Sequence, residues 1–66
     1  MIEKYACIVA KTNNPTYASL LESKGNHTPY TSVRRECDNM VIITPQNYAP
    51  EFEKFLSKRG IKDTIL

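Results

Sequence analysis

The sequence predicts a small α+β domain in which two helices pack on one face of a four-stranded antiparallel sheet. Two apolar runs, Tyr5–Ala10 and Met40–Ile43, have the length and composition of strands buried within a sheet. Two further segments carry apolar residues at helical spacing, and each ends in a basic residue followed by glycine. The remaining two β-prone segments are polar, which suits the edges of the same sheet.

Length and composition agree with a single small domain spanning residues 1–66. The chain has 41% hydrophobic and 24% charged residues, which is typical of a folded protein rather than a disordered one. A chain of this size buries only about 60% of its unfolded surface, so a partner that covers further apolar surface would stabilise it. The net charge of +2 is too small to indicate nucleic-acid binding by itself.

The N-terminal segment Met1–Lys11 has the features of neither a signal peptide nor a membrane span, because its apolar run is short and lacks a cleavage pattern. We therefore expect a cytoplasmic protein in which Cys7 and Cys37 are reduced thiols. Two cysteines about thirty residues apart make no metal-binding motif. Small core residues are the simplest interpretation of both cysteines, and we expect no cofactor and no metal.

The first half of the chain predicts a strand followed by a helix. Tyr5–Ala10 would present alternate residues to opposite faces of the sheet. Asn14 can cap the free amides of a helix, and Pro15 suits its first position, where a missing amide costs no hydrogen bond. We expect this helix to run from about Pro15 to Lys24 and to end at Gly25 in the left-handed conformation.

The middle of the chain predicts a β-hairpin. Residues 30–36 (YTSVRRE) are β-prone at their start and charged at their end, as expected of an edge strand. Asp38–Asn39 is a plausible tight turn. The turn leads into the buried strand Met40–Thr44, which we expect at the centre of the sheet.

The last third predicts a second helix and a final strand. Asn47 can cap the helix, and Pro50 falls within its first turn, where proline is tolerated. Phe52, Phe55 and Leu56 form its apolar stripe. We expect Gly60 to end the helix, and residues 61–66 (IKDTIL) alternate as a last edge strand.

The expected order is β-α-β-β-α-β, and the two halves resemble each other. Residues 8–25 and 41–60 both lead from an apolar strand through a Thr/Asn/Pro loop to a helix closed by a basic residue and glycine. This order fits a ferredoxin-like split β-α-β sandwich, whose first and third strands are central. The apolar strands are the first and third here, so composition agrees with position. A small open sheet with one helix on each face remains the alternative.

A sheet covered on one face only leaves an apolar face exposed, because its central strands are apolar on both sides. Exposed apolar bands in small domains commonly mark interfaces. We take five residues as candidates for a protein interface: Tyr5, Cys7, Val9, Met40 and Ile42. The partner would be a second copy of the chain or another protein. Alternatively, long side chains such as Arg34 or Lys62 lie across the band and screen it.

Nucleic-acid binding is the second hypothesis. RNA-binding domains of this topology stack bases on aromatic residues of both central strands, and Met40–Ile43 has none. The candidate residues for nucleic acid or an anion are basic, aromatic or polar: His27, Tyr30, Arg34, Arg35, Lys11 and Asn13. The favoured interpretation of these residues is a solvated edge strand on which Arg34 or Arg35 pairs with Glu36 or Asp38.

Catalysis is the least supported class. His27 is the only histidine, and it lies in a predicted loop. Cys37 lies close after two arginines and is the best candidate for a reactive thiolate, but a small residue beside a turn is the strongly favoured interpretation. The first strand–helix loop has no arginine for a phosphatase of the acylphosphatase type, and no glycine-rich phosphate loop is present.

The third hypothesis concerns the two loops that precede the helices, residues 11–14 and 44–47. We expect both to lie at the same end of the sheet, where free amides could hold an anion or a small ligand. Our preferred function is nevertheless a small non-enzymatic regulator that binds protein, with a homodimer formed through the open sheet face. Because it is short and shows no convincing catalytic set of residues, the chain resembles accessory or phage-type inhibitors more than enzymes.

Overall fold

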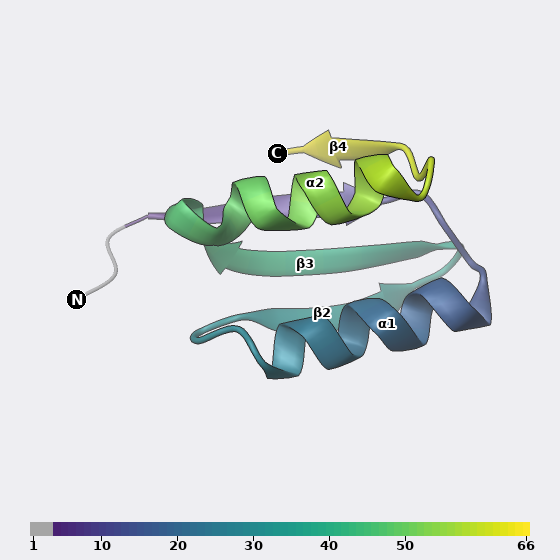
Figure 1. The fold of residues 1–66 in the computed structure, drawn as a ribbon, viewed down its shortest axis with the longest axis horizontal. Coiled ribbons are helices and arrows are strands. Elements are labelled where there is room, and N and C mark those ends of the chain that lie inside the picture. Colours follow the sequence, from purple (N-terminus) through teal and green to yellow (C-terminus); the bar gives the residue numbers. More distant parts are fainter. Residues whose placement is uncertain (1–3) are drawn as a thin grey trace.

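A computed structural model of the chain describes residues 4–66, so the first three residues of the segment Met1–Lys11 lie outside it. Figure 1 shows the fold. In chain order the elements are β1 (Tyr5–Ala10), α1 (Pro15–Asn26), β2 (Ser32–Glu36), β3 (Asn39–Pro45), the 3-10 turn η1 (Gln46–Tyr48), α2 (Ala49–Lys58) and β4 (Asp63–Ile65).

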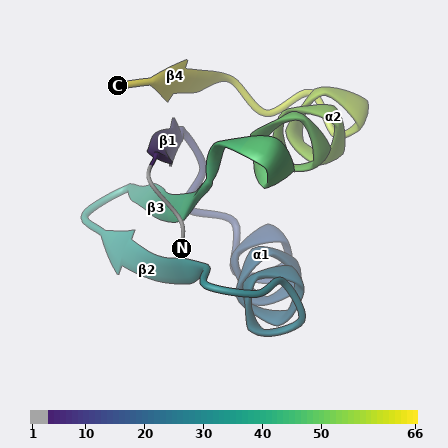
Figure 2. The same ribbon diagram turned by 90° about the vertical axis from the view of Figure 1, so that its left-hand side faces the viewer.

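The sheet has the strand order β2-β3-β1-β4, and every neighbouring pair is antiparallel. This is the ferredoxin-like topology, with β1 and β3 in the centre as the sequence predicts. Both helices lie on the same side of the sheet (Figure 2). The alternative fold, with one helix on each face, is therefore wrong.

The register of β1 and β3 decides which residues enter the core. Ile8 pairs with Ile42, and Ala10 pairs with Met40, so all four project toward the helices. The buried apolar core consists of Ala6, Ile8, Ala10, Ala18, Leu21, Met40, Ile42, Ala49, Phe52, Leu56 and Ile61. Each helix contributes a stripe to this core, which holds the helices against one face only.

The start of α1 follows the prediction, but its end does not. The Asn14 side chain accepts hydrogen bonds from the amides of Thr16 and Tyr17, at 2.9 and 3.3 Å. The helix continues past Lys24 to Asn26, and Gly25 is a buried helical residue. The prediction of Gly25 as a left-handed cap is wrong. Its missing side chain makes room for Val33 of β2, whose methyl group a Cβ at this position would overlap.

For α2 the predicted start is wrong and the predicted end is confirmed. Asn47 lies inside η1, and no side chain caps the start of α2, so the prediction of an Asn47 cap is wrong. Pro50 does fall in the first turn. Gly60 has a φ of 70° and ends the helix as predicted. Its amide bonds to the Ser57 carbonyl at 3.1 Å, and the next amide bonds to Leu56 at 3.0 Å, which is the Schellman pattern.

The edge strands are shorter than predicted. β2 begins at Ser32 because Tyr30 adopts a φ of 58°, which interrupts extended backbone. The hairpin turn is Cys37–Asp38 rather than Asp38–Asn39, since Asn39 already pairs with Glu36. Ahead of β2, the hydroxyl groups of Thr31 and the buried Thr44 share a hydrogen bond of 2.9 Å. This bond provides a partner for a polar group inside the core.

Candidate functional site

The face of the sheet away from the helices carries an apolar band on the two central strands. We call Tyr5, Cys7, Val9, Val41 and Ile43 the open-face band. Cys7 pairs with Ile43, and Val9 pairs with Val41, so these side chains lie next to each other on one face. Tyr5 and Ile43 are 47% and 38% exposed, and the other three are partly exposed.

The open-face band corrects two of the five predicted interface residues. Met40 and Ile42 are only 1% and 0% exposed, because they project into the core beneath the helices. They cannot contact a partner in the folded protein. Their neighbours Val41 and Ile43 take the outward positions on β3. The error is one of parity, since adjacent residues in a strand point to opposite faces.

The polar rim of the band lies on β2. Arg34 is the β2 residue opposite Val41 and therefore shares its face. Its guanidinium lies 3.3 Å from the Glu36 carboxylate, two residues along the same strand. This ion pair holds Arg34 along β2 rather than across the central strands. On the other flank, Thr64 of β4 pairs with Val9, so the band has polar neighbours on both sides.

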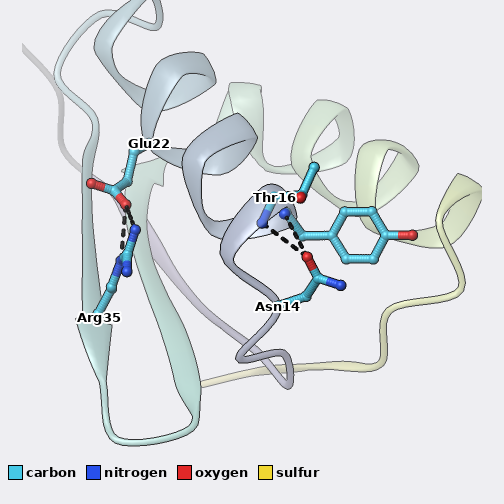
Figure 3. Close-up of polar contacts among 5 residues, drawn as sticks. Asn14, Thr16, Glu22 and Arg35 are labelled. Carbon is cyan, nitrogen blue, oxygen red and sulfur yellow. Dashed lines mark hydrogen bonds and ion pairs between the residues drawn. The ribbon is translucent and has the colours of Figure 1, made fainter.

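The two arginines predicted as one cationic cluster lie on opposite faces of the sheet. Arg35 pairs with Met40 and so projects to the helix side. Its Nε and Nη2 donate to one Glu22 carboxylate oxygen of α1, at 3.0 and 2.9 Å (Figure 3). The ion pair ties β2 to α1. The Arg34–Glu36 pair is one that the solvated-edge interpretation expects, whereas the pairing of Arg35 with Glu22 of α1 was not predicted.

The other nucleic-acid candidates are also dispersed. His27 caps the end of α1, with Nδ1 2.8 Å from the Ser23 carbonyl oxygen. Tyr30 follows at the same end of the molecule and is 73% exposed. Lys11 and Asn13 lie at the other end, between β1 and the start of α1. The six candidate residues do not form one surface.

The starts of the two helices lie at opposite ends of the sheet, contrary to prediction. α1 follows β1 and α2 follows β3, and these strands are antiparallel. The free amides at the start of α1 are bonded to the Asn14 side chain (Figure 3). A shared anion site made from both helix starts is therefore excluded by the topology.

The described residues hold few groups suited to metal or thiol chemistry. Within residues 4–66, no three His, Cys, Asp or Glu side chains come together as a metal site. Both cysteines are free: Cys7 lies in the open-face band, and Cys37 is exposed at the tip of the hairpin with a φ of 53°. Within the same residues, no helix is long and apolar enough to cross a membrane.

Sequence reasoning missed a second surface, a groove between the end of α1 and the outer side of α2. It is lined by Lys24, Glu51, Lys54, Phe55, Lys58 and Arg59. Four of these residues lie on α2 and Arg59 lies at its C-cap, and their helical spacing in the sequence is the signal that could have indicated the groove. The sequence alone favours a simpler interpretation, in which Lys54 faces solvent and the two basic residues after it favour the helix dipole.

Comparison with known proteins adds no relative to these observations: no family model, no curated protein and no solved structure matches the chain. The function must therefore be inferred from the chain's own residues. Two surfaces are candidates for binding, the open-face band on one side of the sheet and the groove on the helix side.

Proposed function

We propose that this chain is a small non-enzymatic regulatory protein that acts by protein–protein binding and forms a homodimer through the open-face band. The observation that carries the proposal is the apolar character of both central strands on the face that no helix covers. Water contact with such a band costs free energy that a partner removes. The partner to which we commit is a second copy of the chain.

The size of the open face agrees with a dimer interface. The molecule measures 34 Å by 21 Å across its two longer axes, whose product is a footprint of about 700 Å². The sheet and helix layers stack along the third axis (Figure 2). A standard stable interface buries about 800 Å² per partner. Sheet-to-sheet packing of two copies would therefore have to use the whole of this face.

The distribution of charge also favours a second copy. A two-fold axis brings the same patch of both subunits together, so the patch must be complementary to itself. The band is uncharged, and its β2 rim offers one cation, Arg34, and one anion, Glu36. A symmetry-related copy can thus place charges of opposite sign against each other at the rim while the apolar residues meet in the centre.

Introducing a charge into the band tests the proposal. We expect Ile43→Lys to convert a concentration-dependent dimer into a monomer, because the ammonium group would lose its water at the interface. Sedimentation equilibrium measures the association. The matched control is Leu20→Lys on α1, which adds the same charge at a residue that is 41% exposed and lies away from the band. A wild-type protein that stays monomeric up to about 1 mM, or a Leu20→Lys variant that dissociates equally, overturns the proposal.

The two cysteines provide an independent reporter. In a Cys37→Ser variant, the remaining Cys7 should react more slowly with a maleimide as protein concentration rises, because dimer formation covers the band. In a Cys7→Ser variant, Cys37 at the hairpin tip should react at a constant rate. If both thiols respond to concentration in the same way, the open face is not the interface.

A further inference from the structure

The groove between α1 and α2 is open to solvent and has a volume of 360 Å³. Both helices lie side by side over the sheet (Figure 2), and the groove is on the side opposite the open-face band. Lys24 contributes from the last turn of α1, and the remaining lining residues belong to α2 and its C-cap. A volume of this size is at the lower end of the range for small-molecule sites, about 300–1,000 Å³.

The groove concentrates the positive charge of the whole chain. Four of the nine basic residues and one of the seven acidic residues line it, which gives the groove a formal charge of +3. The other five basic and six acidic residues sum to −1, while the chain as a whole carries +2. The net positive charge of the protein therefore comes from this one surface. Such a local field attracts anions.

Aromatic rings hold two of these cations in place. The Arg59 guanidinium carbon lies 3.8 Å from the centroid of the Phe55 ring, and Nη1 donates to the Phe55 carbonyl at 3.2 Å. The Lys24 ammonium lies 5.4 Å from the Phe52 ring centroid and 5.8 Å from that of Phe55. These cation–π contacts fix the charges without neutralising them. The cations are thus oriented before any ligand arrives.

Within residues 4–66, no carboxylate pairs with these cations. The ion pairs there are Arg34–Glu36 within β2 and Arg35–Glu22 between β2 and α1, and none of these four residues lines the groove. A favourable interaction with the helix dipole explains the basic residues at the helix ends, which are Lys24, Lys58 and the C-cap residue Arg59. It does not explain Lys54, which lies in the middle of α2, one turn before Lys58. Lys54 is repelled by Lys58, four residues after it, and attracted by Glu51, three residues before it, so these two local effects roughly offset each other and leave the surplus of cations in the groove uncompensated.

We propose that this groove binds a small anion of the polyphosphate class, with Lys24, Lys54, Lys58 and Arg59 as its ligands. Several phosphate oxygens are needed to contact cations distributed over two helices. Lysine ammonium groups act as point charges toward phosphate, and the arginine guanidinium offers paired donors. Glu51, the single carboxylate in the lining, opposes anion binding at one end of the groove and limits the ligand to the end that holds the cations.

Calorimetric titration with pyrophosphate and with orthophosphate at low salt tests the proposal. Pyrophosphate reaches more of the cations at once, so we expect it to bind about tenfold more tightly. Lys54→Gln should weaken pyrophosphate binding roughly tenfold, because one charge-assisted contact is lost. The matched control is Lys62→Gln, an exposed lysine outside the groove, whose loss should change affinity by less than about twofold.

A gain of affinity provides a result that misfolding cannot produce. Glu51→Gln removes the opposing charge, and we expect it to tighten pyrophosphate binding about two- to fivefold. Equal losses in Lys54→Gln and Lys62→Gln would mean diffuse attraction to net charge and would overturn the site. So would the absence of binding at about 10 mM pyrophosphate. Because the groove and the open-face band are on opposite sides, the Ile43→Lys variant should bind pyrophosphate like the wild type.

Discussion

The two strand–helix halves of the chain, residues 8–25 and 41–60, look alike in sequence but build their helix ends differently. Each half has an asparagine and a proline near the start of its helix and a glycine near its end. In the first half the asparagine is a cap and the glycine is a packing residue. In the second half the asparagine is no cap and the glycine is a turn residue.

The difference at the helix starts comes from the route of the chain. Four residues, 11–14, connect β1 to α1, and this spacing leaves Asn14 extended so that its side chain can reach the free amides. After β3 the chain instead coils directly into η1. Asn47 is already inside that turn. Its side chain therefore has no extended backbone from which to cap α2.

The difference at the helix ends comes from the segment that leaves each helix. After α1 the chain enters β2, which packs back against the helix and brings Val33 close to Gly25. After α2 the chain reverses, because Gly60 turns it and the next residue, Ile61, enters the core at 8% exposure. A glycine after a basic residue thus serves close packing in one half and a left-handed turn in the other.

The largest effect is expected for Gly25→Ala. Its Cβ would overlap the Cγ2 of Val33 and lie 3.3 Å from the Val33 Cβ. The branched valine has little freedom to rotate away, so β2 must shift from α1. We expect a loss of about 1–3 kcal/mol in the free energy of unfolding, larger than the gain in helix propensity. Urea denaturation measures the change.

A second substitution distinguishes this clash from a general effect on the helix. In a Val33→Ala background the overlapping Cγ2 is absent and only the 3.3 Å contact with the Cβ of residue 33 remains, so Gly25→Ala should cost much less there. The two substitutions should therefore be strongly non-additive. Additive losses would show that Gly25 is needed for another reason, and the proposed packing role would fail.

Gly60→Ala should cost less, about 1–2 kcal/mol, because only the backbone conformation opposes it. A Cβ at this position would meet no atom within 4 Å, and the φ of 70° is the unfavourable feature. Asparagine tolerates the left-handed region better than alanine, so Gly60→Asn should recover part of the stability measured by urea denaturation. If alanine and asparagine cost the same, conformational strain is not the cause.

The sequence predicted the fold because its local and long-range signals agree. The apolar or polar composition of each strand distinguished the central strands from the edge strands. The order of the elements then left few possible topologies. The ends of the elements were less predictable. Asn47 and Gly25 have the right residue types for caps, but their roles depend on where β2 and η1 direct the chain, which is a tertiary effect.

The candidate surfaces were predictable only in part. The sequence showed that the central strands are apolar on both faces. The alternation of side chains along a strand does not tell which of the two faces the helices cover. The inward position of Met40 and Ile42 follows from their pairing with Ala10 and Ile8. The groove could not be predicted from one element, because Lys24 contacts α2 only after both helices pack on the sheet. No pattern within a single helix contains that contact.

Asn14→Ala should destabilise the protein by about 1 kcal/mol, the usual effect of losing a helix cap. The substitution leaves the amides of Thr16 and Tyr17 without the acceptor they have at 2.9 and 3.3 Å. Ser or Asp at position 14 should restore most of the stability, since each offers a side-chain oxygen to the same amides. A serine variant as unstable as the alanine variant would contradict the capping role.

Asn47→Ala is the matched substitution in the second half, and it should have the smallest effect. No side-chain hydrogen bond caps η1 or α2, so removal of the Asn47 amide leaves no backbone donor newly unpaired. We expect a change within about 0.5 kcal/mol, as for an exposed surface residue. Urea denaturation of this variant beside Asn14→Ala compares the two halves directly. A loss at position 47 as large as that at position 14 would mean that the halves start their helices in the same way, and the contrast between them would then hold only at the glycines.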